Sequence, residues 1–443
     1  MLKTFKRGGV HPAENKITAT VPIADLPVPK TAFIPVGQHL GAPATAVVKK
    51  GDKVKTGQLI ARSSSFVSAN IHSSVSGTVS KVDMIPDMSG YPRMGVVITV
   101  EGDEWDETID RTTNLVNGKD LTGAEILKKI EDAGIVGQGG ATFPTHVKLV
   151  PPKGNKAEIL LINGVECEPY LTSDHRLMLE KPDEILTGTS LLMKALNVEK
   201  AFIGIENNKP DAIALLTEKA RNYQGIAVVP LKVKYPQGGE KQLIKAVTGR
   251  EVPSGGLPVA IGVVVNNVGT AFSVYEAVLK NKPCFERIVT ITGEGVKNPG
   301  NFRVRIGTPL SELIDAAGGM QEQTGKIVSG GPMMGKAIAS ADVPVTKGTS
   351  GVLLLNEEHA FRQKTMPCIR CSRCAGVCPM GLEPYLLMSV VEKEIYDRAE
   401  KEKVMDCMEC GSCSYTCPSN RPLLDHIRLG KLKVSQALRA RKN

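Results

Sequence analysis

Residues 368–379 read CIRCSRCAGVCP, and residues 407–418 read CMECGSCSYTCP. Both stretches follow the pattern C-x2-C-x2-C-x3-C-P, and together they hold eight of the ten cysteines in the chain. Three thiolates at this spacing can wrap one face of a cubane cluster, and two such runs are typical of proteins with two [4Fe-4S] clusters. The runs therefore predict a C-terminal two-cluster ferredoxin domain that passes single electrons.

The fourth cysteine of each run decides which residues share a cluster. In two-cluster ferredoxins this cysteine, which precedes the proline, ligates the other cluster. Zinc is the alternative, because C-x2-C pairs also bind zinc, but a four-ligand zinc site does not call for the longer run twice. We therefore expect one cluster on Cys368, Cys371, Cys374 and Cys417, and the other on Cys407, Cys410, Cys413 and Cys378.

Length and composition indicate a large protein of several domains. With 443 residues, of which 42% are hydrophobic and 23% charged, the chain is too long for one core. No targeting segment is visible, and no apolar run approaches the ~20 residues of a membrane span. We expect a cytoplasmic protein that spans no membrane.

The charge is unevenly placed. The net charge is +9, and residues 426–443 contain Lys and Arg but no acidic residue. Such a tail is either solvated or meets an anionic partner. Basic patches interleaved with aromatic residues are absent, so nucleic acid is not an expected partner.

Residues 1–105 are expected to hold a small β-sandwich after an irregular, Pro-rich start of about 30 residues. Short β-branched runs alternate with turns between Thr31 and Val100. This part resembles the biotinyl/lipoyl-like barrel-sandwich domain, a family that attaches its cofactor to a lysine on a hairpin. The corresponding stretch 65–77, SFVSANIHSSVSG, has no lysine, so we expect a structural module. His72 is expected to be an ordinary packed or surface residue.

Residues 106–285 alternate strands with helices, which predicts a parallel α/β sheet. Thr122 and Glu125 form a capping box at the start of the first helix. In parallel sheets, ligands bind outside the carboxyl ends of the strands. Strands are expected at 157–162, 201–206, 226–235 and 259–266, and further helices from about Asp174, Pro210, Glu240 and Thr270.

The last two parts complete a multidomain α/β and α+β protein. Residues 286–355, with strands at 287–293 and 326–328 around a helix at Leu310, suggest a β-grasp module. Residues 356–443 hold the ferredoxin domain, with one helix expected from Leu382 to about Met405. A last helix should run from about Leu423 into the basic tail.

A glycine-rich stretch, GIVGQGGATFPTHVKL at 134–149, follows the first helix of the α/β part. Gly137, Gly139 and Gly140 allow a ligand to approach the backbone, and consecutive N–H groups suit an anion such as phosphate. A tight loop without a ligand is the alternative. Phe143 can stack on a base, and Lys148 can bind phosphate or the edge of a reduced flavin.

Two further stretches follow strands of the same sheet. NGVECEP at 163–169 and NNVGT at 266–270 should meet the glycine loop at the carboxyl edge. Their amides can bind ring edges and ribityl hydroxyls, and the carboxylates of Glu166 and Glu168 can bind ribose and raise each other's pKa. Ordinary turn chemistry is the alternative, since Asn and Gly favour loops.

The glycine loop, NGVECEP, YPQGGE at 235–240 and NNVGT together resemble the flavin domain of the NADH-binding subunit of respiratory complex I. With a barrel-sandwich domain before it, a β-grasp module after it and a double ferredoxin at the end, the whole chain resembles the RnfC family, the C subunits of Rnf complexes. A related cobalamin-reductase flavoprotein shares these parts but begins at the glycine loop.

The resemblance implies an FMN and an NAD(H) in one pocket. Phe143 would stack on the adenine, Glu168 and Glu240 would face the nicotinamide half, Glu166 would lie close to the flavin ring, and Tyr235 would line the pocket. The flavin itself would be held by Gly137, Gly139, Gly140, Lys148, Asn163, Asn266, Asn267 and Thr270.

The chain departs from the complex I pattern mainly in the dinucleotide contacts. Val165 and Gly239 stand where that pattern has acids, and a second pocket aromatic is replaced around Val150-Pro151. The resemblance implies a peripheral subunit at the cytoplasmic face of a bacterial membrane. Its partners would be an iron–sulfur subunit, integral membrane subunits that move Na+ or H+ and, indirectly, ferredoxin. The alternatives are a non-catalytic electron-wire or scaffold subunit and the cobalamin-reductase role.

Overall fold

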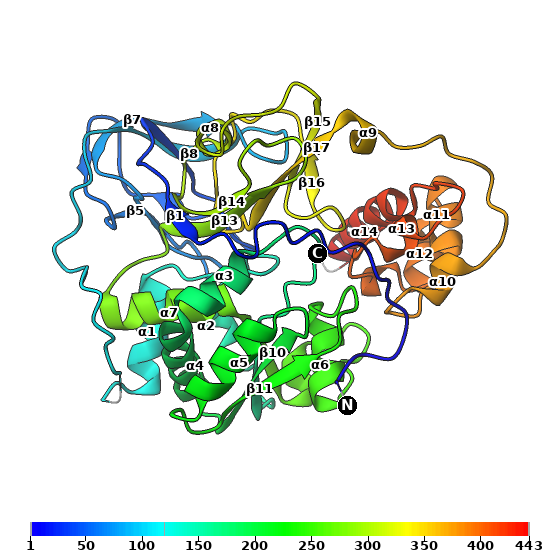
Figure 1. Cartoon of the computed structure of the whole chain (residues 1–443), viewed down its shortest axis with the longest axis horizontal. Coiled ribbons are helices and arrows are strands. Elements are labelled where there is room, and N and C mark those ends of the chain that lie inside the picture. Colours follow the sequence, from blue (N-terminus) through cyan, green and yellow to red (C-terminus); the bar gives the residue numbers. More distant parts are fainter. Residues whose placement is uncertain (1, 119, 442–443) are drawn as a thin grey trace.

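The centre of the protein is a four-stranded parallel sheet of order β11-β10-β9-β12. The structure is a computed structural model that describes residues 2–118 and 120–441 (Figure 1). The parallel α/β prediction is confirmed. The strands are β9 (Ile159–Asn163), β10 (Lys200–Glu206), β11 (Ile226–Leu231) and β12 (Val263–Asn267), and the helices are α1 (Gly123–Asp132), α2 (Thr145–Lys148), α3 (Ser173–Glu180), α4 (Pro182–Leu196), α5 (Pro210–Ala220), α6 (Glu240–Thr248) and α7 (Val268–Lys280).

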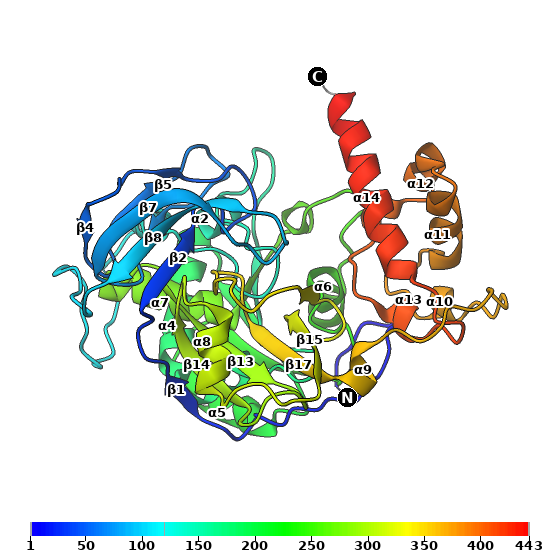
Figure 2. The ribbon, with the colours of Figure 1, turned by 90° about the horizontal axis from the view of Figure 1, so that it is seen from above.

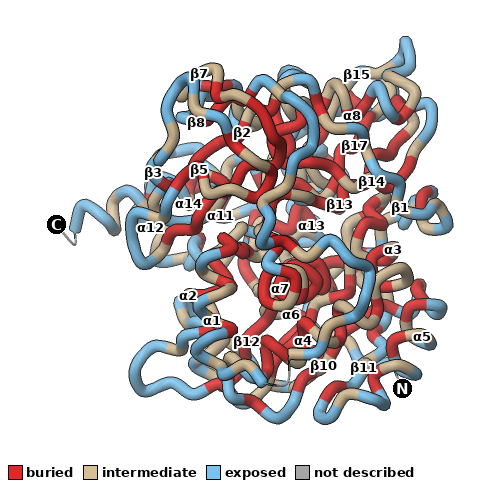
Figure 3. Tube along the Cα trace, turned by 90° about the vertical axis from the view of Figure 1, so that its left-hand side faces the viewer, coloured by how far each residue is buried: buried red, intermediate tan, exposed pale blue. Residues whose placement is uncertain are grey.

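Alternation along β9 places helices on both faces of this sheet. Leu160 and Ile162 join the core formed with α4 and α7, whereas Leu161 packs in a separate core with α6. Helix α7 is buried over most of its length (Figure 3). The capping box of Thr122 and Glu125 is present, as predicted.

Three expected boundaries in this part were wrong. The strand expected at 226–235 ends at Leu231, because the chain after it bonds to the N-terminal residues instead of to β10, with the Tyr235 N–H donating to the Val10 carbonyl. The strand expected at 259–266 begins only at Val263, because Pro258–Ile261 form a 3-10 turn that ends at Gly262 in the left-handed region. The helix expected from Thr270 begins at Val268, because the Asn267 side chain caps it by accepting a hydrogen bond from the Gly269 N–H.

The N-terminal β-structure forms two small sheets, of order β2-β8-β7-β4 and β3-β5-β6. Their buried residues, among them Ile34 and Ile60, continue into the core of the α/β part. His72 is buried on β6, in keeping with a packed residue. The strands are β2 (Thr31–Pro35), β3 (Thr45–Ala46), β4 (Lys53–Val54), β5 (Leu59–Arg62), β6 (Ile71–His72), β7 (Gly77–Ile85) and β8 (Arg93–Val100).

A six-stranded mixed sheet of order β1-β14-β13-β17-β15-β16 forms the β-grasp module. Its edge strand β1 (Ile23–Asp25) comes from the N-terminal stretch that we expected to be irregular, and it pairs with β14. The other elements are β13 (Glu286–Thr292), β14 (Gly300–Arg305), α8 (Leu310–Ala316), β15 (Thr324–Ser329), β16 (Lys336–Ile338), β17 (Gly351–Asn356) and α9 (Glu357–Ala360).

The cysteine runs lie in a helical part on one side of the molecule (Figure 2). The single helix expected from Leu382 to Met405 was wrong. It is broken where Glu394 and Lys403 adopt positive φ, a conformation that a right-handed helix cannot include. The elements are α10 (Arg373–Gly376), α11 (Pro384–Glu392), α12 (Tyr396–Lys401), a 3-10 turn (Val404–Asp406), α13 (Ser412–Tyr415) and α14 (Leu423–Ala440).

Residues 2–25, called the N-terminal strap below, connect these parts. Val10 and Tyr235 exchange two main-chain hydrogen bonds of 2.8 and 2.9 Å, and the Gly9 N–H donates to the Val377 carbonyl at 2.8 Å. The strap then crosses the middle of the molecule to reach β1 (Figure 1). No helix among residues 2–118 and 120–441 is long and apolar enough to span a membrane.

Candidate functional site

The glycine loop lies against the start of α7. The Gln138 N–H donates to the Thr270 hydroxyl at 3.0 Å. Gly139 sits so close to Asn267 that a Cβ built on it would lie 2.8 Å from Asn267 Nδ2. Gly139 and Gly140 are exposed. The loop therefore presents free backbone at the carboxyl edge of β12.

Arg287, from β13 of the β-grasp module, braces this loop. Its Nη2 donates to the Gln138 carbonyl at 3.2 Å, its Nη1 to the Gln138 side-chain oxygen, and its Nε to the Thr349 carbonyl at 3.2 Å. Burial lowers the pKa of Arg287. No local sequence signal marks this residue, because it belongs to another module.

Asn163 and Asn267 are paired residues at the carboxyl ends of the neighbouring strands β9 and β12. Asn267 Nδ2 donates to Asp174 Oδ2 at 2.6 Å and to the Asn163 carbonyl at 3.3 Å. Asn163 Nδ2 donates to the Gly238 carbonyl at 2.8 Å. Burial, with the charge of Glu166, raises the pKa of Asp174 to about 7. The structure thus joins both asparagine stretches to the YPQGGE loop, and it adds Asp174, which sequence reasoning missed.

Asn266 carries the observation that fits a bound cofactor. Its side chain is only 5% exposed, and its Nδ2 has no hydrogen-bond partner among the described residues. A buried polar group left without a partner costs roughly 1–3 kcal/mol. FMN carries carbonyl, hydroxyl and phosphate oxygens that can accept such a bond, so this edge suits it.

Lys148 and Glu240 come together as an ion pair of 2.7 Å, with both side chains partly exposed. The pair connects α2, directly after the glycine loop, to the first residue of α6. Phe143 is half-buried in the same loop. These three residues therefore flank the loop at its accessible side.

Glu166 lies at the start of α3. Its carboxylate accepts hydrogen bonds from the Asp174 N–H at 2.7 Å, the His175 N–H at 3.2 Å and the Ser173 hydroxyl at 3.3 Å. These groups are the free donors at the start of α3, where a carboxylate is favoured. The side chain of Glu166 is therefore a helix cap, and its expected place close to the flavin ring stays a prediction.

Glu168 and Tyr235 lie together but face the other modules. Glu168 accepts from the main-chain N–H groups of Met333 and Met334 at 3.1 and 2.8 Å, in the β15–β16 loop. The Tyr235 hydroxyl lies 3.2 Å from Glu168 and 2.8 Å from the Cys410 carbonyl. Burial, rather than Glu166, raises the pKa of Glu168. The two side chains form a junction between three parts of the protein.

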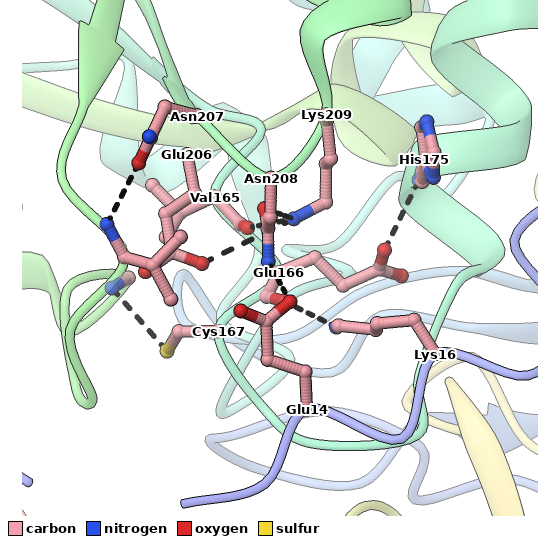
Figure 4. A network of polar contacts seen from close by, with 12 residues as sticks. Glu14, Lys16, Val165, Glu166, Cys167, His175, Glu206, Asn207, Asn208 and Lys209 are labelled. Carbon is pink, nitrogen blue, oxygen red and sulfur yellow. Dashed lines mark hydrogen bonds and ion pairs between the residues drawn. The ribbon is translucent and has the colours of Figure 1, made fainter. Parts of the chain in front are cut away.

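Lys16 of the strap holds the NGVECEP loop from outside (Figure 4). Its ammonium donates to the carbonyls of Glu166, Glu168 and Leu171 at 2.6 to 2.8 Å. Beside Lys16, residues of the strap line one side of a cavity of about 260 Å³, which lies after the carboxyl ends of β9 and β10. The sequence could not reveal Lys16, because the contacts span about 150 residues.

The cysteines of the second run share a cavity with one cysteine of the first. Cys378 lines it together with Cys407, Cys410 and Cys413. The first run differs, since its Cys368 and Cys371 are exposed and its Cys374 is half-buried, whereas in the second run Cys410 and Cys413 are buried and Cys407 and Cys417 are half-buried. The runs are thus asymmetric in the fold, although their sequences follow one pattern.

The second run packs on the α/β part. A Cβ on Gly239 would lie 2.4 Å from Met408 Cε, and Gln242 Nε2 lies 3.3 Å from Met380 Sδ. Gly239 stands where the complex I pattern has an acid, so its small size makes room for the cysteine loop. Val165, at the other departure, is fully buried against α6.

Four families of known domains match successive parts of the chain. The RnfC barrel sandwich hybrid domain matches residues 3–103, and the Nuo51 FMN-binding domain matches residues 130–276. The SLBB domain, the β-grasp module above, matches residues 288–337, and a 4Fe-4S dicluster domain matches residues 361–418.

Curated relatives align with most of this chain. The C subunit of the proton-translocating ferredoxin:NAD(+) oxidoreductase complex of Clostridium ljungdahlii is 50% identical over 406 residues, which cover 90% of this chain and 87% of the relative. The C subunit of the Na(+)-translocating complex of Acetobacterium woodii is 46% identical over 97% of both chains. The structure of an NAD+-reducing [NiFe]-hydrogenase aligns with a TM-score of 0.49 at 19% identity, over 70% of this chain and 62% of that chain. By its relatives, the chain belongs to the RnfC family, the C subunits of the ion-translocating ferredoxin:NAD+ oxidoreductase (Rnf) complexes.

Proposed function

We propose that this chain exchanges hydride between NAD(H) and FMN and passes the electrons singly through two [4Fe-4S] clusters. An electron-transfer role in an ion-translocating ferredoxin:NAD+ oxidoreductase follows from its family, its FMN-binding domain and its dicluster domain. A bound flavin supplies the step between two-electron and one-electron chemistry. The single observation that carries the proposal is the Tyr235–Cys410 contact, which joins the predicted flavin edge to a cluster loop.

The residues of the α/β part would bind and orient the cofactors. Backbone N–H groups of the glycine loop would meet the phosphate, and Lys148 would offset anionic charge on the flavin. Phe143 and Glu240 would lie toward the dinucleotide, with Glu168 and Tyr235 supporting the pocket from the cluster side. The flavin contacts we propose are Gly137, Gly139, Gly140, Lys148, Asn163, Asn266, Asn267 and Thr270.

Anaerobic purification followed by quantitation of iron, sulfide and flavin tests the cofactor content. We expect about eight iron atoms and one FMN per chain, and a visible band that NADH bleaches. Gly139→Ala and Lys148→Ala should yield protein that lacks flavin but retains iron. Gly249→Ala serves as the control, because a Cβ there meets nothing within 4 Å. If both site variants keep full flavin occupancy, the flavin pocket does not lie at the glycine loop.

The ligand sets would be crossed, with Cys378 serving the second run and Cys417 the first. The support is the cavity that Cys378 shares with Cys407, Cys410 and Cys413. Cys378→Ser should therefore remove the cluster of the second run, which lowers iron to about four atoms per chain. Cys284→Ala, at a buried cysteine outside both runs, should keep all the iron. EPR identifies which of the two clusters survives, and loss of the exposed first-run cluster instead would refute the crossing.

The chain would work as one subunit among several, since its relatives are named as subunits of complexes. We propose that it lies peripherally at the cytoplasmic face, beside integral membrane subunits that move the ion and an iron–sulfur subunit that carries electrons to or from ferredoxin. Co-purification of the tagged chain with detergent-solubilised membrane subunits, lost after a carbonate wash of the membranes, would be the expected result.

A further inference from the structure

The first cysteine run lies on the outside of the molecule. Residues 361–373 are exposed without interruption, and they run along the outer edge from α9 to α10 (Figures 1 and 2). The segment is held by the residues that follow the second cysteine run. The Met366 N–H donates to the Ser419 carbonyl at 2.9 Å, and Asn420 Nδ2 donates to the Lys364 carbonyl at 3.3 Å. It therefore offers a defined surface, called the outer face below.

The outer face is cationic. No acidic residue occurs between Phe361 and Leu382. Arg362 pairs with Asp425, but Lys364, Arg370 and Arg373 have no ion-pair partner in residues 2–118 and 120–441. Three cations without an ion pair among the described residues thus lie close in sequence to the exposed Cys368 and Cys371.

The second run shows the opposite arrangement. Cys410 and Cys413 are buried, and Glu409, directly before Cys410, is paired with Arg428 at 3.1 Å and Lys431 at 2.7 Å. These two cations belong to the basic tail, and Arg441 of the tail pairs with Glu400 and Asp397. Much of the tail's charge is therefore used inside the domain, which leaves the outer face as the more available cationic surface.

Apolar side chains complete the outer face. Phe361, Met366 and Ile369 are 74%, 50% and 67% exposed. An exposed apolar group within a charged rim is the usual composition of a protein interface. A lipid headgroup would satisfy the cations, but it cannot accept an electron from a cluster whose ligands are exposed at the same place.

We propose that the outer face docks an acidic protein that carries single electrons, and that the cluster of Cys368 and Cys371 exchanges electrons there. The inference rests on the proposed function, since it needs the clusters. Complementary charge steers encounter and raises association rates at low salt by one to three orders of magnitude. Electrons leave or enter where a cluster approaches the surface, and the second run, whose Cys410 and Cys413 are buried, is less open there than the first.

Charge reversal tests the outer face directly. The double variant Lys364→Glu, Arg370→Glu is reduced with dithionite, desalted and mixed in a stopped-flow instrument with an oxidised two-cluster ferredoxin of net negative charge. We expect its rate to fall at least tenfold below wild type at low ionic strength, and the difference to shrink as salt is raised. The control Lys49→Glu, Lys50→Glu reverses two exposed lysines of the N-terminal β-structure and should keep the wild-type rate.

A neutral quinone acceptor separates docking from cluster tuning. Its reduction should stay within twofold of wild type, because it does not sense the surface charge. If the rates with ferredoxin and with the quinone fall equally, the cations act on the reduction potential of the cluster and not on docking, which would overturn the proposal. An unchanged rate of ferredoxin reduction in the double variant would also overturn the proposal. The same holds if the variant loses binding to anionic vesicles but still reduces ferredoxin.

If the charge-reversed variant fails to fold, Lys364→Gln, Arg370→Gln replaces it and should give an intermediate rate of ferredoxin reduction. Because dithionite supplies the electrons, failure of NADH to reduce the wild type would count against the proposed function alone.

Discussion

The hydroxyl of Tyr235 lies 2.8 Å from the main-chain carbonyl of Cys410, a contact that spans 175 residues of sequence. Tyr235 is itself fixed by two main-chain hydrogen bonds to Val10 of the strap. A residue of the FMN-binding domain thus touches the backbone of a proposed cluster ligand. This contact is why we propose that the second run exchanges electrons with the flavin, whereas Cys368 and Cys371 of the first run are exposed.

Tyr235→Phe should slow electron transfer between flavin and clusters. The change removes the donor to the Cys410 carbonyl, and a net hydrogen bond of about 1 kcal/mol corresponds to a roughly fivefold change in the population of the docked arrangement. In stopped-flow with NADH, we expect the flavin band to bleach at the wild-type rate while the cluster band lags about fivefold. Tyr223→Phe, whose hydroxyl lies 3.1 Å from Thr187, is the control. If the flavin and cluster bands of Tyr235→Phe bleach at equal rates, the Tyr235–Cys410 hydrogen bond does not contribute to electron transfer.

Gly8→Ala should loosen the strap from the ferredoxin part. Gly8 has a φ of +66°, and a Cβ there would lie 2.6 Å from the Cys378 carbonyl group. We expect full flavin content, cluster reduction by NADH slowed at least tenfold, and faster hydrogen exchange in the strap. Gly249→Ala shares the positive φ, +76°, but has open space, so it isolates the backbone cost of about 1 kcal/mol. If the two variants behave alike, the contact at Cys378 does not hold the strap.

Asn266→Leu should weaken flavin binding without harming the apo protein. The orphan Nδ2 costs free energy when no ligand is bound, and leucine has similar volume without that cost. We expect FMN affinity to fall at least tenfold, by fluorescence titration, and the apo melting temperature to stay equal or rise. A lower apo melting temperature with unchanged FMN affinity would mean that the amide is structural.

His72 should make the protein less stable as the pH falls below 6.5. Burial lowers the pKa of His72 to about 3, so between pH 6.5 and 3 only the unfolded chain binds the proton. The free energy of unfolding should then fall by about 1.4 kcal/mol per pH unit in this window, and stay constant from this source above pH 6.5. Unfolding curves at pH 7.5 and 5.5 measure the effect, and His72→Gln should show a smaller difference between them. An identical difference in the variant would exclude His72 as the source.

The elements of the α/β part could be predicted because their signals are local. The capping box at Thr122, the buried run of β9 and the proline that opens α5 act within a few residues. The broken helix after Leu382 was missed because Glu394 and Lys403 carry no Gly or Asn signal for their positive φ. Tertiary packing decided those two positions.

The candidate site divides in the same way. Asn163 and Asn267 could be placed together because parallel strands bring their carboxyl ends to one edge. The cap formed by Glu166, the clamp by Lys16 and the brace by Arg287 could not be predicted, since each depends on a partner in another part of the chain.

The sequence by itself determined the chemistry of the cysteine runs, because two runs at this spacing supply the eight thiolates that two clusters need. It left the two runs equivalent. Only the tertiary structure made them different, through the strap and Tyr235 on the second run and open solvent on the first. The physical reason is that ligand spacing is encoded within twelve residues, whereas burial and charge around a cluster are set by whatever the rest of the chain packs against it.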